Sequence, residues 1–156
     1  MFILQIILIV LLTVAVFFDV QKRRIPNVLT LGGVVMGVGV HIILSGLPGL
    51  QESGVGLLLA GIVGLGFWLA GMIGGADHKL LMAVGAFVGG TLIIPVMVAV
   101  ALAGGAQALL WILVAKRRAP GTSMRALLRS VRLPYSVSIA VGTLTMLFLQ
   151  HVHLVP

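Results

Sequence analysis

The chain has 156 residues, of which 60% are hydrophobic and only 8% are charged, whereas an ordinary soluble domain is about 25% charged. This composition excludes a soluble globular fold, and the absence of cysteine excludes disulfides and thiolate metal sites. The formal net charge of +7 indicates membrane topology rather than a nucleic-acid partner, because basic residues gather on the cytoplasmic side of membrane proteins.

Long apolar stretches without charged residues recur along the whole chain, and a hydrocarbon core about 30 Å thick requires roughly 17 to 25 such residues per helix. They cover residues 1–18, 28–50, 53–76, 80–115 and 133–150. The fourth stretch would form a helix about 54 Å long, so we expect two spans there, divided by the turn-forming residues Gly89, Gly90 and Pro95. The first stretch lacks the basic n-region and the cleavage site of a signal peptide. The sequence therefore predicts an all-α, polytopic membrane protein with six transmembrane helices in a single domain, residues 1–156.

The distribution of basic residues predicts the orientation of these spans. With six helices, one side of the membrane carries residues 21–27, 74–79 and 116–132, which together contain all ten Lys and Arg residues. The opposite loops, around 47–53 and 89–95, contain none. The positive-inside rule then makes the basic side cytoplasmic and places both termini outside the cytoplasm.

Two further patterns concern structure. Small residues recur at four-residue spacing, which lets helices pack closely in lipid; they are Gly33 and Gly37, then Gly56, Ala60 and Gly64, then Gly85 and Gly89. Residues 123–132 place apolar side chains on one helical face and arginines on the other. This segment is expected to be an interfacial amphipathic helix on the anionic cytoplasmic leaflet, with a regulatory or partner-binding role as an alternative.

The chain has only three carboxylates: Asp19, Glu52 and Asp77. Glu52 is expected in a solvated outer loop, where it needs no function. Asp19 and Asp77 lie at the same predicted depth at the cytoplasmic edge, and ionisable groups there are costly unless they are paired or functional. The structural alternative is that Asp19 neutralises Lys22 or Arg23 and that Asp77 caps a helix.

Asp19 and Asp77 are the candidate catalytic residues. Two carboxylates brought close together cannot both ionise cheaply, so one keeps a proton while the other is anionic. Such a pair can activate a water for attack on an amide without a nucleophilic side chain, a metal or a cofactor. We therefore expect no cofactor and no metal.

No other side chains form a convincing catalytic or metal site. His41, His151 and His153 belong to predicted outer segments, and the spacing of the last two is a weak metal signal. His78 follows Asp77 directly, but adjacent helical residues point in different directions. Ser123, Ser130 and Ser136 lack a plausible base and an orienting partner, which argues against a serine peptidase.

Three segments resemble the type IV prepilin peptidase family. Residues 19–27, Asp-Val-Gln-Lys-Arg-Arg-Ile-Pro-Asn, are similar to its Asp-x4-Arg-x-Pro-Asn signature, and residues 74–79, Gly-Gly-Ala-Asp-His-Lys, are similar to its Gly-x-Gly-Asp-x-Lys motif. Residues 134–142 resemble its Pro-Tyr-x-x-Ala-Ile-x-x-Gly pattern. One departure is Ala76, which stands where the bacterial motif usually has its second glycine, so the turn before Asp77 must form without it.

The resemblance implies that Asp19 and Asp77 are the family's two catalytic aspartates. It implies an aspartic endopeptidase in the cytoplasmic membrane of a prokaryote, which cleaves the leader of a prepilin-like protein substrate at the cytoplasmic face. Larger members carry an additional cytosolic region and also methylate the new N-terminus. We expect no such region here, because the chain resembles the short form found with Flp/Tad-type pili, and methylation is therefore not expected.

Two other classes remain as alternatives. A small proton-coupled transporter would use the aspartates as a relay, although such proteins usually place ionisable groups near the membrane midplane. A non-enzymatic assembly protein of a pilus or secretion apparatus would use the basic segment 116–132 to bind a cytoplasmic partner, but this leaves the aspartates unexplained. The expected partners are thus a prepilin-like substrate and the lipid bilayer, with no nucleic acid, and the sequence specifies no oligomeric state.

Overall fold

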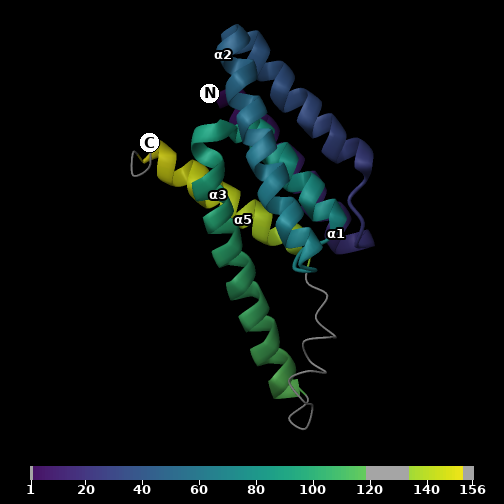
Figure 1. Ribbon diagram of the computed structural model, residues 1–156. Coiled ribbons are helices and arrows are strands. Elements are labelled where there is room, and N and C mark those ends of the chain that lie inside the picture. Colours follow the sequence, from purple (N-terminus) through teal and green to yellow (C-terminus); the bar gives the residue numbers. More distant parts are fainter. Residues whose placement is uncertain (1, 119–133, 153–156) are drawn as a thin grey trace.

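The computed structural model describes residues 2–118 and 134–152, and the regular structure within these residues is entirely helical (Figure 1). The helices are α1 (Phe2–Lys22), α2 (Asn27–Leu69), α3 (Gly75–Arg118) and α5 (Tyr135–His151). This confirms the all-α prediction for the described part of the chain. The amphipathic helix predicted at residues 123–132 lies outside the described residues.

Three helices, α1, α2 and α3, are long and apolar enough to cross a membrane, which indicates a membrane protein. This count differs from the six predicted spans because α2 and α3 each join two of the predicted spans in one element of 43 and 44 residues. Helix α5 has 17 residues, at the lower limit of a membrane-spanning length. The structure therefore establishes neither six spans nor the side on which the termini lie.

Both long helices contain a break at a glycine. Gly46 in α2 has a φ of 61° and Gly89 in α3 has a φ of 78°, a left-handed conformation that glycine adopts without steric cost. Figure 1 shows that each helix folds back there, and that the two turns lie toward the same end of the molecule. The break predicted near Gly89 is confirmed, whereas the loop predicted at 47–53 is helical and the turn comes earlier, at Gly46.

The two long helices pack through small residues. All buried residues of α2 are small, and they are Thr30, Gly33, Gly37, Gly49, Ser53, Gly56, Ala60 and Gly64. A Cβ atom on Gly56 would lie 2.2 Å from the carbonyl oxygen of Gly85, and one on Gly37 would lie 3.0 Å from the backbone of Ala86. The four-residue spacing in the sequence therefore does mark a close contact between helices, as expected.

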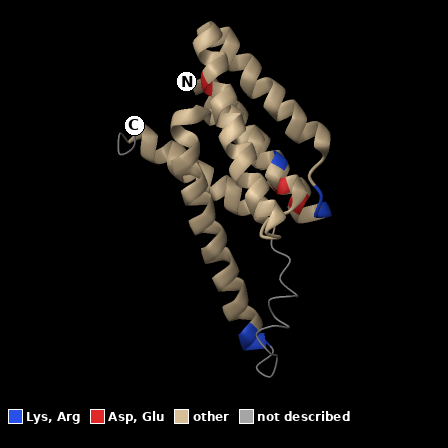
Figure 2. Cartoon of the chain, viewed as in Figure 1, with Lys and Arg blue, Asp and Glu red and all other residues tan. Residues whose placement is uncertain are grey.

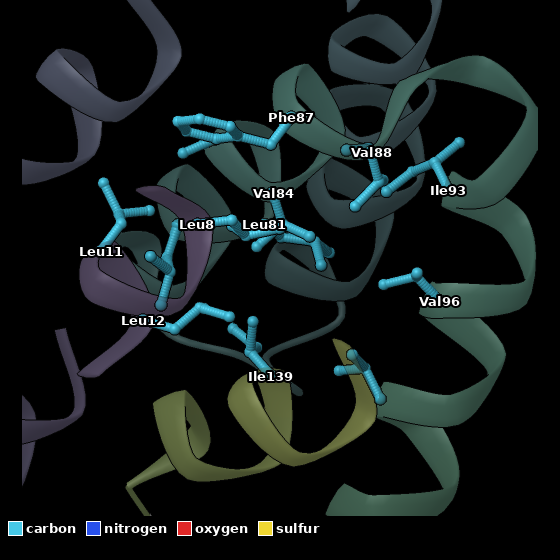
Figure 3. Packing of buried hydrophobic residues seen from close by; sticks show 14 of the residues in the cluster. Leu8, Leu11, Leu12, Leu81, Val84, Phe87, Val88, Ile93, Val96 and Ile139 are labelled. Carbon is cyan, nitrogen blue, oxygen red and sulfur yellow. The ribbon is translucent and has the colours of Figure 1, made fainter. Parts of the chain in front are cut away.

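Apolar side chains of α1, α3 and α5 form the rest of the interior (Figure 3). Leu8 and Leu12 of α1 are 1% exposed, and they meet Val84 of α3 and Ile139 of α5, which are fully buried. Many large apolar side chains instead point outward, including Val28 and Ile43, which are 84% and 83% exposed. Such an apolar outer surface would be unfavourable in water and suits a protein whose solvent is lipid.

Side chains of α2 satisfy the polar backbone groups that the break at Gly89 sets free. Ser53 Oγ donates a hydrogen bond of 2.7 Å to the Ala86 carbonyl, and His41 Nε2 lies 3.0 Å from the Phe87 carbonyl, which requires the proton on that nitrogen. Glu52 Oε1 accepts hydrogen bonds from the Thr91 N–H and hydroxyl, at 3.0 and 2.9 Å. The prediction that Glu52 is a solvated loop residue without a task is therefore wrong, because it is helical, half-buried and caps the second part of α3.

Candidate functional site

Asp19 lies in the last turn of α1, where the backbone turns sharply toward α2. The Arg23 N–H donates to the Asp19 carbonyl at 2.8 Å, and Arg23 ends the helix with a left-handed φ of 51°. Pro26 then adopts an extended conformation and occupies the cap position at the start of α2. Lys22 lies over the Phe18 ring, 5.5 Å from its centroid.

Asp77 lies in the first turn of α3, directly after the turn that joins α2 to α3. Its Oδ2 atom accepts a hydrogen bond of 3.2 Å from the Gly74 N–H, the reciprocal contact of a capping box. The capping role considered from the sequence is thus present. The left-handed residue of this turn is Gly71, with a φ of 71°, whereas Ala76 is already helical. Alanine therefore fits the position where the family motif usually has glycine.

The fold brings the two aspartates together although 57 residues separate them in the chain (20–76). The carboxylate of Asp19 is close enough to that of Asp77 for a direct electrostatic interaction. Figure 2 shows two acidic positions side by side among basic residues, and the third acidic position toward the other end of the molecule. That third residue, Glu52, lines a separate cavity of about 390 Å³ with Leu4 of α1 and Gln150 of α5.

Helix α5 completes this site. Ser136 Oγ donates a hydrogen bond of 2.5 Å to Asp19 Oδ2, and Tyr135 lines the same cavity as Asp77. From the sequence, no base and no orienting partner was evident for Ser136, whereas the structure gives its hydroxyl an acceptor, Asp19. The available signal was its place in the first turn of the helix whose opening resembles the family pattern.

A hydrogen bond also joins the two segments that carry the aspartates. Lys79 Nζ donates to Asn27 Oδ1 at 2.9 Å, so the residue after the first motif's proline contacts the last residue of the second motif. The contact links the start of α2 to the start of α3 and fixes the two ends of the site relative to each other.

A cavity of about 420 Å³ opens beside Asp77. Its walls are apolar or small apart from Asp77 and the Tyr135 ring, and the second part of α3 contributes Ala101, Gly104, Gly105 and Ala108. A second hollow of similar size is lined by Ala76 together with Lys22, Arg23 and Arg24. Asp77 is therefore reached from a mainly apolar cavity, and a basic hollow lies between the end of α1 and the start of α3.

The histidines take no part in this arrangement. The His78 Nδ1 atom is buried against Gly64 and accepts or donates no hydrogen bond in the described structure. His151 packs edge-on against the Phe2 ring, with centroids 6.3 Å apart, and His153 lies outside the described residues. Among residues 2–118 and 134–152, no group of three or more His, Cys, Asp or Glu side chains could hold a metal ion.

This geometry permits acid–base chemistry on a bound water. Each carboxylate uses its Oδ2 atom in a hydrogen bond to the protein, from Ser136 for Asp19 and from Gly74 for Asp77. Both side chains are only half-buried, and a cavity of about 420 Å³ adjoins Asp77. A pair of close carboxylates that shares one proton can supply both a base and an acid.

Comparison with known proteins gives an independent result. The model of the type IV leader peptidase family matches residues 6–112, which is more than half of the chain and includes both aspartates. No curated protein matches, and neither does any solved structure. The family consists of proteases, so the comparison supports a leader peptidase in general terms. The chain belongs to the type IV leader peptidase family.

Proposed function

We propose that this leader peptidase is an aspartic endopeptidase and that Asp19 and Asp77 are its catalytic residues. The observation that carries the proposal is that the fold brings Asp19 within electrostatic reach of Asp77, and that Asp77 lines a cavity of about 420 Å³. In the described residues they are the only acidic side chains other than Glu52, which is engaged with Thr91 elsewhere. A proton relay would not need a cavity of about 420 Å³ at Asp77.

The pair would act on a water held between the carboxylates and the scissile peptide. The ionised aspartate takes a proton from the water as its oxygen attacks the carbonyl carbon, and the protonated aspartate polarises the carbonyl oxygen. Collapse of the tetrahedral intermediate breaks the C–N bond, and the leaving amine receives a proton from the pair. The reaction needs no cofactor and no metal, and no covalent intermediate forms.

The proposed placement is the cytoplasmic edge of the cytoplasmic membrane of a prokaryote, with six spans and both termini outside. Helices of 43 and 44 residues would be about 65 Å long, about twice the hydrocarbon thickness. Their breaks at Gly46 and Gly89 support a division into two spans each. Lys22, Arg23 and Arg24 follow Asp19 within five residues, and they share a hollow with Ala76, the residue before Asp77. This supports a cytoplasmic active site by the positive-inside rule.

The proposed substrate is a prepilin-like precursor with a short basic leader before an apolar, membrane-inserted segment. An active site at the membrane edge reaches peptide bonds at the end of such a segment, and the mainly apolar cavity beside Asp77 suits its side chains. The expected environment is the lipid bilayer, with no nucleic-acid partner. Methylation of the new N-terminus is not part of the proposal.

The test is leader cleavage by purified protein in lipid, with Asp19→Asn and Asp77→Asn. Each change removes one carboxylate from the pair at nearly constant volume, so kcat/KM should fall at least about 10²-fold, the lower range for a lost general acid or base. Glu52→Gln is the matched control, because it is the same acid-to-amide change away from the pair and keeps an acceptor oxygen for Thr91. Substantial cleavage by either folded aspartate variant, or no cleavage by the unmodified protein, would overturn the proposal.

A further inference from the structure

The hydroxyl of Ser136 is the one side-chain donor that the described structure places on Asp19. Ser136 is fully buried, and its Oγ–Oδ2 distance is 2.5 Å. The serine lies in the first turn of α5, and Asp19 lies in the last turn of α1, 117 residues earlier. The contact therefore connects the end of α1 to the start of α5, which are far apart in the sequence.

We propose that Ser136 is a positioning residue for Asp19, which fixes the orientation of this carboxylate for the attack on the peptide bond. The inference rests on the proposed function of Asp19. It concerns a position that the family pattern leaves free, since the resemblance at residues 134–142 runs through Pro134 and Tyr135 but not through Ser136.

The physical need for a positioning group follows from where Asp19 lies. Its helix ends three residues later at Lys22, and the next residue, Arg23, leaves the helical conformation. A half-buried aspartate on such a final turn can rotate between several side-chain conformations. A hydrogen bond from a hydroxyl to a carboxylate is short and strong, and it leaves the second oxygen of Asp19 for the water.

The burial of Ser136 favours a positioning role and argues against a role as a nucleophile. Ser136 has no exposed surface, whereas the side chain of Asp19 is partly exposed. A serine with no exposed surface cannot be reached by a peptide carbonyl without a rearrangement of α5. Its hydroxyl can act on the reaction only through Asp19.

Ser138 offers a matched control on the same helix. It is 2% exposed, and its hydroxyl donates to Gln107 Oε1 instead of to an aspartate. Ser136→Ala and Ser138→Ala therefore both remove one buried hydroxyl and one hydrogen bond to a polar side chain. They differ in whether Asp19 is the group that loses its partner.

The experiment measures kcat and KM for cleavage of a prepilin leader, together with thermal unfolding, for purified protein in lipid. Ser136→Ala should lower kcat about 10- to 100-fold with little change in KM, the scale expected when a reacting group is misplaced by about 1 Å. Ser136→Thr retains the hydroxyl and should restore most of kcat. Ser138→Ala should lower the unfolding temperature while kcat stays within about twofold of the unmodified protein.

Three outcomes would overturn the inference. They are an unchanged kcat in Ser136→Ala, an equal loss in Ser138→Ala, and labelling of Ser136 by a fluorophosphonate, which would show a nucleophile. If Ser136→Ala or Ser136→Thr does not fold, Ser136→Cys decides, because a thiol of similar shape is a weak donor and should give an intermediate kcat. An inactive Asp19→Asn with a fully active Ser136→Ala refutes the positioning role alone, whereas an active Asp19→Asn refutes the proposed function.

Discussion

The contact between Gly56 and Gly85 gives a sharp prediction about stability. A Cβ atom on Gly56 would lie 2.2 Å from the Gly85 carbonyl oxygen and 2.7 Å from the Gly89 carbonyl carbon. Both neighbours are backbone atoms of α3, so no side-chain rotation relieves the overlap. Ordinary contacts of a Cβ atom begin near 3.4 Å, and Gly56→Ala therefore requires the helices to separate by roughly 1 Å.

We expect Gly56→Ala to destabilise the protein by about 1 to 3 kcal/mol, the usual cost of overpacking. The estimate is a net value, because alanine by itself would stabilise a helix interior by up to about 1 kcal/mol relative to glycine. Gly54→Ala isolates that gain, since Gly54 lies on the same helix and nothing is within 4 Å of its added Cβ atom. The two substitutions are thus chemically identical, but Gly56→Ala should lower the free energy of unfolding and Gly54→Ala should raise it.

The assay is denaturant unfolding in lipid bicelles, followed by tryptophan fluorescence. Trp68 is a suitable reporter, because its ring packs against Gly75 where α2 connects to α3. The double variant Gly56→Ala/Gly85→Ala should cost less than the sum of the single changes, since one separation of the helices relieves both. A Gly56→Ala protein as stable as Gly54→Ala would show that the close approach of α2 and α3 is not as described.

Two further predictions concern Glu52 and the topology. Glu52→Leu should lower the free energy of unfolding by about 1 to 3 kcal/mol, because the Thr91 N–H and hydroxyl lose their acceptor. Glu52→Gln should lower it less, and neither change should reduce kcat. Equal stability of the two variants would contradict the capping role. Reporter fusions after Asn27, Leu50 and Ala119 should report a cytoplasmic, an external and a cytoplasmic location, because only this order places all ten basic residues on one side. An external location at Ala119 would mean that α3 crosses the membrane only once.

The sequence predicted the features that depend on composition and on regular spacing. The apolar content predicted helices in a membrane, and the glycines at four-residue intervals predicted the contact of α2 with α3. The two aspartates could be selected because so few carboxylates exist in the chain. Each of these signals is local, or is a property of the chain as a whole.

The contacts that the sequence did not predict all join distant segments through single side chains. The hydrogen bonds of Ser136 with Asp19 and of Lys79 with Asn27 span 117 and 52 positions, and no periodicity marks such pairs. Glu52 was misjudged for a related reason. Its position in a polar stretch suggested a solvated loop, whereas its carboxylate is needed by a helix break 39 positions later.

The length of the first part of α3 explains why that break needs so much support. Residues 75–88 form 14 helical residues, or about 21 Å, which is shorter than a hydrocarbon core of about 30 Å. If Asp77 lies at the membrane edge, as proposed, the turn at Gly89 lies below the opposite surface. Water is scarce at that depth, and each unsatisfied backbone group costs several kcal/mol. His41, Ser53 and Glu52 supply the hydrogen bonds that water supplies to an exposed turn. The short first part of α3 therefore positions Asp77 at one end, and at its other end it requires these polar residues of α2 as hydrogen-bond partners.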